Sequence, residues 1–349
     1  MNNGNTSQRS KSSRYQPIKI IFELTNLCNF SCIHCIRHEG GLTHYLSPEI
    51  IEKVLRESQA YHSVSLVSFT GGEPTIHPKF GEIARLVADF GYSFSFVTNA
   101  WQYQKTFEQL RPVKSAIGFV NFSIDGATAE THDSIRKRSG SFRKLMEAIS
   151  LYKINGIPVH INMVITKTNV DEMEAMVRLA TQLGCAAVGF AHCQPTPDAV
   201  AANMVMNIAE RRQVESEIAR LQQMYQLPVY LAGDHHNESP FFQCAQLQMR
   251  EFNIDHRGYL SACCVLSNYR GGLTDSDIVA DLNEVSFYEA HLRLMAKINE
   301  VNAEKIHHIA AGKMDAADKF ICTHCLLHYQ KVPDLKSVLL PEVSQKQYR

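Results

Sequence analysis

The chain has 349 residues, 45% of them hydrophobic and 20% charged, a composition typical of a globular protein with a sizeable core. Its 35 basic residues balance its 35 acidic residues, which removes the usual electrostatic case for a nucleic-acid or anionic-membrane partner. No apolar run approaches the roughly 18 residues that span a bilayer, and the N-terminal segment lacks the apolar stretch of a secretory signal, so we expect a cytoplasmic protein with no membrane partner.

Short strands alternate with amphipathic helical stretches over residues 17–230, after a segment, 1–16, whose polar composition predicts disorder. The predicted strands are rich in Val, Ile and Phe, as strands buried on both faces tend to be. They are 18–24, 64–69, 92–98, 118–124, 158–165 and 185–191. Six βα units in a row predict a parallel sheet with right-handed crossovers. Because six units are too few for a closed eight-stranded barrel, we expect an α/β fold with an open, partial (β/α)6 TIM-like barrel.

Local signals mark the ends of the predicted helices. Ser47 is a good N-cap and is followed by Pro48, which suits the first position of a helix. Gly91, Gly156 and Gly184 each stand just before a predicted strand, where a helix-terminating glycine belongs. By analogy with complete barrels, the functional site is expected at the carboxyl ends of the strands.

The alternation fades after residue 230, and five of the ten cysteines lie beyond that point. In a chain without a secretory signal, clustered cysteines indicate metal or redox chemistry before disulfides. We therefore predict a smaller, cysteine-rich α+β domain over residues 231–332, organised around metal. No structure is predicted for the tail, 333–349.

Three cysteines follow the first predicted strand with the spacing C-x3-C-x2-C: Cys28, Cys32 and Cys35. A structural zinc site needs four ligands, and His34 or His38 could supply the fourth. The alternative is a four-iron cluster with three protein ligands, in which one iron stays open for a cofactor or a substrate.

This cysteine pattern resembles the signature of the radical S-adenosylmethionine (SAM) enzymes, and further motifs of that family follow in order. The ends of the second, third and fourth predicted strands resemble the family's GGEP, VTNG and SxDG motifs. They read Thr70-Gly71-Gly72-Glu73-Pro74, Val97-Thr98-Asn99-Ala100 and Ser123-Ile124-Asp125-Gly126. Downstream, Arg136 lies in a segment similar to one whose arginine contacts the SAM carboxylate.

The resemblance implies a SAM-binding set drawn from these motifs: Gly71, Gly72, Glu73, Pro74, Asn99, Ser123, Asp125 and Arg136. Backbone groups and Glu73 would hold the SAM ammonium, because glycines permit close approach and a carboxylate pairs with a cation. His34 replaces the aromatic residue that usually packs near the adenine. Taken singly, a tight turn, helix caps or a solvated basic face would explain these motifs. Their order along four strand ends favours the family.

A second cysteine pattern resembles the SPASM auxiliary-cluster domain, in its shortened twitch form. Cys244 and Cys263 flank Gly258, and the pair Cys322 and Cys325 comes much later. The resemblance implies that these four thiolates fully ligate one auxiliary 4Fe-4S cluster. A zinc ion shared with His328 is the alternative. Cys264 is expected to be a packed thiol, or to exchange roles with Cys263.

The resemblance implies an oxidoreductase-type enzyme that cleaves SAM to a 5'-deoxyadenosyl radical and removes a hydrogen atom from its substrate. A flavodoxin or ferredoxin would supply the electron. Because a fully ligated auxiliary cluster has no vacant iron, we expect it to accept an electron, which favours net oxidation.

Two substrate classes follow from the relatives of such enzymes. A small polar metabolite of the sugar, aminocyclitol or nucleoside type is the first expectation, and a ribosomal peptide that is crosslinked or epimerised is the alternative. An epimerase needs a hydrogen-atom donor, for which Cys193 is a candidate, although a packed free thiol is the simpler interpretation. His192, Asp234, His235 and His236 are pocket candidates by composition alone. A non-catalytic zinc or redox-sensing protein is the remote alternative.

Overall fold

The computed structural model describes residues 18–37, 42–239, 241–332 and 334–340, and one ten-stranded sheet runs through it. The strands are β1 Ile18–Thr25, β2 Val64–Gly71, β3 Ser93–Thr98, β4 Ile117–Ser123, β5 Val159–Ile165, β6 Ala187–His192, β7 Val229–Leu231, β8 Glu251–Ile254, β9 Tyr259–Ser261 and β10 Ile278–Asp281. The α-helices are α1 Pro48–Tyr61, α2 Phe80–Asp89, α3 Tyr103–Leu110, α4 Ala129–Arg136, α5 Ser141–Ile154, α6 Met173–Gln182, α7 Pro197–Ala201, α8 Ile208–Met224, α9 Phe287–Ala310, α10 Ile321–His328 and α11 Leu335–Leu339.

The sheet has the order β10-β9-β8-β1-β2-β3-β4-β5-β6-β7. Every neighbouring pair from β8 to β7 is parallel, whereas β9 pairs antiparallel with both β8 and β10. The sheet does not close, which confirms the predicted α/β partial barrel. The six predicted strands are all present within two residues of their expected bounds. The short strands β7 and β8 extend the parallel sheet beyond those six. The sequence does not predict them, because strands of three and four residues leave no readable periodicity.

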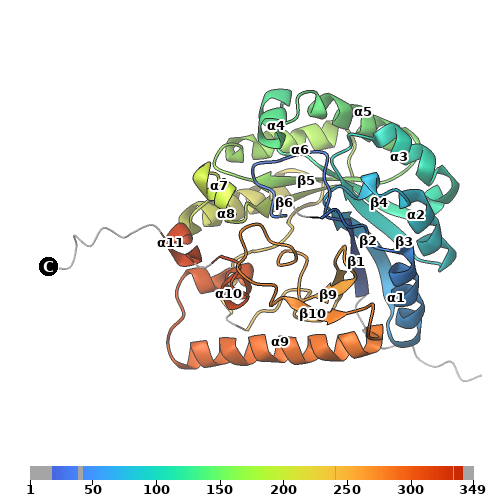
Figure 1. Ribbon diagram of the computed structural model, residues 1–349. Coiled ribbons are helices and arrows are strands. Elements are labelled where there is room, and N and C mark those ends of the chain that lie inside the picture. The colour runs from blue at the N-terminus through green and yellow to red at the C-terminus, as the bar shows by residue number, and fades with distance from the viewer. Residues whose placement is uncertain (1–17, 38–41, 240, 333, 341–349) are drawn as a thin grey trace, which may run out of the picture.

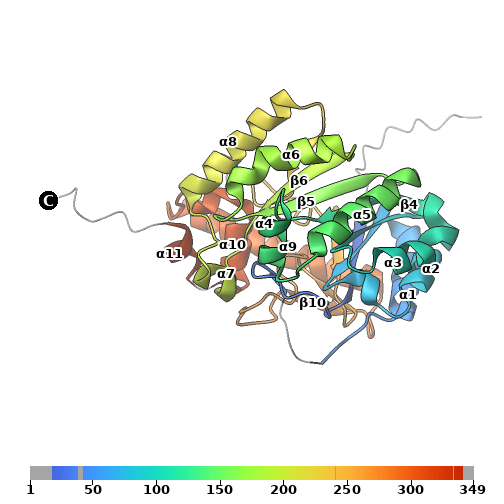
Figure 2. The ribbon, with the colours of Figure 1, turned by 90° about the horizontal axis from the view of Figure 1, so that it is seen from above.

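Figure 1 shows the helices α1 to α6 along the outer side of the curved sheet, and α9 on the other side of the molecule, beneath β9 and β10. Seen from above in Figure 2, α1, α2, α3, α5, α6 and α8 follow one another in chain order, while α4 and α7 lie outside this row. This order is that of consecutive βα units. Within the described ranges, no helix combines the length and apolarity needed to cross a membrane.

The cysteine-rich region shares the barrel's sheet instead of forming a separate one. Strand β8 lies parallel to β1, with Lys19 opposite Glu251. Phe252 of β8 and Phe287 of α9 belong to the same continuous core as the barrel strands. The predicted tail also contains a short helix, α11, whose Leu335 and Leu339 are buried. The expectation of an unstructured tail is wrong there, since a five-residue helix is too short to show a helical period. Residues 1–16 lie outside the described ranges.

The barrel strands differ in how far they are buried. In β5, Val159, Ile161 and Met163 are buried against the helices, while the intervening His160 and Asn162 are half-buried. Strands β1 and β6 are instead buried along most of their length, which confirms for them the expectation of strands buried on both faces. Polar residues of neighbouring strands also meet, since Ser95 donates a hydrogen bond to Ser68 at 3.2 Å.

The predicted helix boundaries are confirmed. The Ser47 side chain accepts a hydrogen bond from the Ile50 amide, with proline at the start of α1. Gly91, Gly156 and Gly184 have φ values of +81°, +73° and +62°, which glycine adopts without strain. They end helices at the point where the chain turns into the next strand.

A pair of histidines joins α1 to α9 next to β8. The His62 ring lies 4.7 Å from that of His291 and 5.2 Å and 5.6 Å from those of Phe252 and Phe287, measured between centroids. Burial, together with the neighbouring His291, lowers the pKa of His62 to about 4. Between about pH 6.5 and pH 4, His62 therefore stays neutral in the folded protein. In the unfolded chain the same histidine has its ordinary pKa near 6.5 and takes up a proton in this range.

We expect the free energy of unfolding to fall as pH decreases from about 6.5 to about 4. The unfolded chain binds more protons in this window, so stability rises with pH there. Replacing His62 with Leu removes one such group and makes the dependence shallower, by less than about 1 kcal/mol per pH unit after discounting for partial exposure. Urea denaturation at several pH values measures the slope, with His307→Leu, at an exposed position of α9, as the control. An unchanged slope in His62→Leu would contradict the assignment.

Candidate functional site

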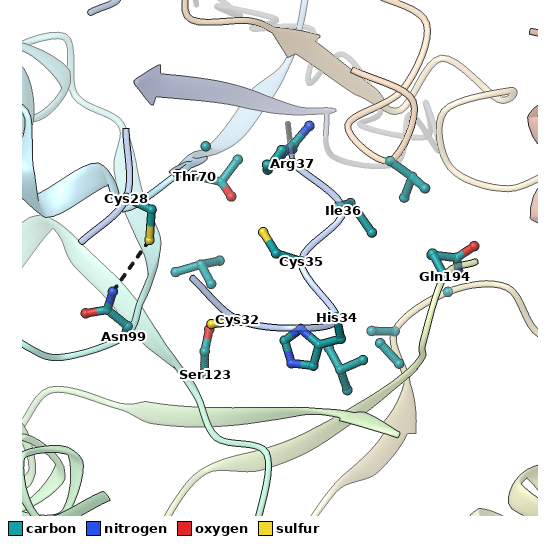
Figure 3. Close-up of a pocket in the computed structure, with 18 of the residues that line it drawn as sticks. Cys28, Cys32, His34, Cys35, Ile36, Arg37, Thr70, Asn99, Ser123 and Gln194 are labelled. Atoms are coloured by element: carbon teal, nitrogen blue, oxygen red, sulfur yellow. Dashed lines mark hydrogen bonds between the residues drawn. The ribbon is translucent and has the colours of Figure 1, made fainter. Parts of the chain in front are cut away.

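The three cysteines that follow β1 line one cavity of about 370 Å³ at the carboxyl ends of the barrel strands. Figure 3 shows Cys28, Cys32 and Cys35 on one loop, with Asn99 and Ser123 beside them. The cavity lies within the ~300–1,000 Å³ range usual for ligand sites. It also includes ten other residues that the sequence singles out: His34, Gly71, Gly72, Glu73, Asn99, Ser123, Arg136, His192, Asp234 and Cys322. Tertiary structure thus brings the motifs of four strand ends to one place.

The two glycines of the GGEP motif dock against the beginning of the cysteine loop. The Gly72 amide donates to the Thr25 carbonyl at 2.7 Å, and the Glu73 amide donates to the Leu27 carbonyl at 2.8 Å. A Cβ at Gly71 would overlap the Thr25 carbonyl oxygen, and one at Gly72 would overlap that of Leu27. The close backbone approach that these glycines permit is therefore to the beginning of the cysteine loop. Both glycines also line the cavity.

Glu73 is buried and connects the ends of β2 and β3. One carboxylate oxygen accepts from the hydroxyls of Thr75 and Thr98 at 2.6 Å and 2.8 Å, and the other accepts from the Asn99 amide at 2.8 Å. The oxygen bonded to Asn99 has one donor and so keeps the capacity to accept from a ligand ammonium group. Burial raises the pKa of Glu73. Pro74 begins a short turn behind Glu73 and does not line the cavity.

Asn99 ties the end of β3 to the cysteine loop. Its side-chain nitrogen donates to the Asn29 side-chain oxygen at 2.8 Å and lies 3.9 Å from the sulfur of Cys28 (Figure 3). The next residue, Ala100, has a φ of +63°, a conformation that glycine adopts more easily. This backbone geometry explains why the related family motif has glycine at this place.

Asp125 is completely buried and collects contacts from three segments, the cysteine loop, α4 and β5. Its carboxylate lies 2.7 Å from the His34 ring nitrogen and 2.6 Å from the guanidinium of Arg136, and accepts from the Val164 amide at 3.0 Å. The Asp125 amide in turn donates to the His132 ring at 3.2 Å. Arg136 and His34 hold the pKa of the carboxyl well below its usual range, against the effect of burial.

Asp125 itself does not line the cavity, unlike Arg136 and His34, whose positions it fixes. The structure therefore gives it a positioning role instead of the direct SAM contact expected from the SxDG motif. Arg136 is likewise buried, which corrects the alternative of a solvated basic face.

The donor set fits an iron–sulfur cluster. Burial raises the pKa of Cys28 to about 12 and that of Cys32 to about 11, so these thiols need a bound cation to become thiolates. The Phe30 amide donates to the Cys28 sulfur at 3.4 Å, the kind of N–H···S contact that tunes cluster sulfurs.

In the described part of the chain, no three His, Cys, Asp or Glu side chains converge on the position of a single metal ion. A four-iron cluster does not need such convergence, because each thiolate binds a different iron. His38 lies outside the described residues.

The later cysteines line a second cavity, of about 460 Å³, that adjoins the first. The cysteines on its wall are Cys244, Cys263, Cys264, Cys322 and Cys325. Cys322 lines both cavities, and its amide donates to the Asp234 carboxylate at 3.0 Å. The Val265 amide donates to the Cys263 sulfur at 3.4 Å, as the Phe30 amide does to Cys28. His328, the alternative zinc ligand, pairs instead with Glu304 and is not on the cavity wall.

Cys193 does not reach the first cavity, although both of its neighbours do. It is 2% exposed, belongs to a second hydrophobic cluster and lies 3.7 Å from the Gln194 carbonyl oxygen. The hydrogen-donor assignment is therefore wrong, because the strand end turns this thiol into the core. Among the other candidates, Asp234 lines both cavities, His235 lines the second, and His236 lines neither.

The sequence missed Arg37, which also lines the first cavity. Its guanidinium lies 3.1 Å from the buried Glu23 carboxylate and donates to the Ser267 carbonyl, which joins the cysteine loop to the later region. Burial raises the pKa of Glu23 to about 7, despite its arginine partner. Because Ser267 is 230 residues from Arg37, no local pattern could have revealed this contact.

Residues 22–180 match the Radical SAM superfamily. The chain is 32% identical over 187 residues to an AdoMet-dependent heme synthase of Methanosarcina barkeri, which covers 52% of each chain. It is 32% identical over 174 residues to the mycofactocin maturase MftC of Mycobacterium tuberculosis, which covers 48% of this chain and 43% of that one. The matches thus span about half the length of these curated relatives.

The fold also matches the crystal structure of Streptococcus suis SuiB bound to precursor peptide SuiA. The TM-score is 0.67 at 15% identity, over 88% of this chain and 76% of that one. At this identity the likeness shows a common fold. The superfamily match shows that residues 22–180 form a radical SAM domain.

Replacing Asp125 with Asn should destabilise the protein by about 3 kcal/mol, because it leaves the buried Arg136 without an anion. We also expect the variant to retain less iron after anaerobic reconstitution, since His34 loses the partner that fixes the cysteine loop. Urea denaturation and iron analysis measure the two effects. Asp171→Asn, at an exposed position before α6, is the matched control. Wild-type stability of Asp125→Asn would refute the positioning role.

Replacing Ala100 with Gly should raise the unfolding free energy by about 0.5 kcal/mol. Glycine removes the strain of the left-handed conformation in the folded state, which is worth about 1–2 kcal/mol. This gain is larger than the loss of about 0.4–1 kcal/mol that arises because glycine raises the backbone entropy of the unfolded chain. Ala100→Val should instead lower stability by more than about 1 kcal/mol, because a β-branched residue tolerates this φ poorly. Chemical denaturation of both variants gives the order, and a glycine variant less stable than wild type would contradict it.

Proposed function

We propose that this chain, whose radical SAM domain is established, is a maturase that modifies a ribosomally made precursor peptide through a substrate radical. The observation that carries the radical chemistry is the single cavity where Cys28, Cys32 and Cys35 meet the ends of β2, β3 and β4. A bound 4Fe-4S cluster with an open iron, together with SAM, supplies a 5'-deoxyadenosyl radical.

The chain's own residues hold and orient these groups. Cys28, Cys32 and Cys35 would ligate three irons, and the fourth iron would have no protein ligand from this loop. Glu73, with the backbone of Gly71 and Gly72, would receive the SAM ammonium, because one carboxylate oxygen still has acceptor capacity.

The remaining SAM contacts would come from other residues of the same cavity. Arg136 would bind the SAM carboxylate through the guanidinium nitrogens not engaged by Asp125. Asn99 and Ser123 also line this cavity. His34, locked by Asp125, offers a ring for stacking on the adenine.

The second cavity would hold an auxiliary 4Fe-4S cluster on Cys244, Cys263, Cys322 and Cys325. Cys322 lines both cavities, so this proposed ligand of the auxiliary cluster also borders the first cavity. Full ligation by four cysteines suits electron acceptance, so the proposed reaction is a net oxidation. Cys264 would be a packed neighbour that hydrogen-bonds Cys263. A flavodoxin or ferredoxin would reduce the first cluster.

A peptide substrate is favoured over a small polar metabolite, which we place second. One relative is named a maturase, and the SuiB structure that shares this fold contains a precursor peptide. The alignment with SuiB also extends over most of this chain, including the cysteine-rich region. The heme synthase relative supports the second candidate, a small-molecule substrate.

Anaerobically reconstituted protein should contain about eight irons, two clusters of four. Changing Cys28, Cys32 and Cys35 to Ala should leave about four irons and abolish the formation of 5'-deoxyadenosine from SAM with dithionite. Changing Cys244 and Cys325 to Ala should also leave about four irons but retain SAM cleavage, since the first site is intact. Iron and sulfide analysis with chromatography measures both quantities.

The outcomes separate the competing assignments. Four irons in wild type and none in the first variant would remove the auxiliary cluster and favour zinc in the second cavity. No iron in any of the proteins would remove the enzyme assignment. Cys185→Ala, a buried thiol at the opposite end of the barrel, is the matched control and should keep all the iron.

The substrate class is tested with short peptides encoded beside the gene. Each is incubated with the reconstituted enzyme, SAM and dithionite, and the product is analysed by mass spectrometry. A mass loss of about 2 Da, equivalent to two hydrogens, is expected for an oxidative crosslink. If no encoded peptide changes while a porphyrin precursor does, the small-molecule candidate replaces the peptide.

A further inference from the structure

His192 and Gln194 stand at the end of β6, on a part of the cavity wall that no SAM motif occupies. Figure 3 shows Gln194 across the cavity from Asn99, with Cys32, Cys35 and His34 between them. Both residues line the cavity, whereas Cys193 between them points into the core. The strand end therefore presents two polar side chains toward the space left for a substrate.

Both side chains are buried and lack protein partners for key atoms. His192 is 4% exposed and Gln194 is 9% exposed. Within the described residues, both ring nitrogens of His192 and the side-chain oxygen of Gln194 have no hydrogen-bond partner. Because unpaired buried polar groups carry a desolvation penalty, such a cluster in a cavity points to a ligand that pairs with them.

The surroundings fix these groups in place. The Gln194 side-chain nitrogen donates to the His192 carbonyl at 3.3 Å, which leaves the side-chain oxygen as the free acceptor. The Phe320 ring meets the His192 ring edge-on at 6.2 Å. Burial and the nearby Arg211 lower the pKa of His192 to about 4, so the ring is neutral at pH 7 and has one donor and one acceptor.

The charges around the cavity favour a neutral ligand at this position. Asp234 pairs with the buried Arg211, Arg37 pairs with Glu23, and Arg136 pairs with Asp125. Glu73 lies with the SAM motifs, at the ends of β2 and β3. Near His192 and Gln194, the unsatisfied groups are thus one free acceptor and one neutral ring.

We propose that His192 and Gln194 form an amide-binding subsite that holds a backbone peptide unit of the substrate. Gln194 accepts the substrate N–H through its side-chain oxygen, and the His192 ring donates to the substrate carbonyl. This inference rests on the proposed peptide-modifying function and names how that substrate is recognised. It places the bound peptide in the cavity that Cys322 also lines.

The test uses reconstituted, SAM-loaded protein and capped tripeptides of the form acetyl-Gly-Xaa-Gly-N-methylamide, with every residue type at Xaa. Calorimetry identifies the tightest binder, and its central amide is then replaced by an ester, which removes one N–H. We expect the ester to bind wild type about tenfold more weakly than the amide, for the loss of one buried hydrogen bond.

Gln194→Met has a similar size but no acceptor. It should bind the amide about tenfold more weakly than wild type does, and should no longer distinguish amide from ester. His192→Phe keeps the ring against Phe320 and should weaken both ligands about equally. His160→Phe, on the adjacent strand with its ring stacked on Phe119, is the matched control and should behave as wild type.

Three results would overturn the subsite. An undiminished amide-to-ester ratio in Gln194→Met would show that the N–H binds elsewhere. Weaker SAM binding in His192→Phe or Gln194→Met, with peptide affinity unchanged, would assign these residues to SAM. Absence of any tripeptide binding to wild type would remove the peptide subsite. The proposed function fails separately, when wild type forms no 5'-deoxyadenosine or modifies no encoded peptide.

Discussion

The buried Asp125 carboxylate is the interaction on which the arrangement of the site depends. The carboxylate contacts the His34 ring, the Arg136 guanidinium and the Val164 amide. These three groups belong to the cysteine loop, α4 and β5. A buried carboxylate that lost these partners would be strongly unfavourable, so the three segments are held together. The loop that carries Cys28, Cys32 and Cys35 is thereby fixed against the barrel.

The other edge of the cysteine loop is anchored by backbone contacts and by a second buried pair. The GGEP turn hydrogen-bonds the beginning of the loop, which requires glycine at positions 71 and 72. Arg37, at the end of the loop, bridges Glu23 of β1 and the Ser267 carbonyl. Because β8 also pairs with β1, the cysteine-rich region is built onto the barrel, and the two cavities share a wall.

A shared wall gives the two cysteine sites distinct surroundings. The first cavity combines thiols with the backbone-rich ends of β2 and β3, the paired Arg136 and the unsatisfied groups after β6. The second, of about 460 Å³, is lined by five cysteines together with charged side chains that include Lys19, Arg250 and Glu251. The first cavity therefore combines three cysteines of one loop with the GGEP turn and Arg136, whereas the second gathers the later cysteines and contains no part of the GGEP turn.

The sequence by itself determined the barrel strands, the helix boundaries and the three-cysteine loop, because periodicity, capping and short motifs are local properties. It also located the residues that line the first cavity on β2, β3 and β4, since parallel strands place their carboxyl ends at one edge. Only the tertiary structure decided that Asp125 positions its neighbours, that Cys193 faces the core, and that Arg37 contacts Ser267. It also joined β8 to β1 and left His192 and Gln194 unpaired in the cavity. These outcomes depend on the direction of single side chains and on contacts across 200 residues or more, which no local pattern encodes.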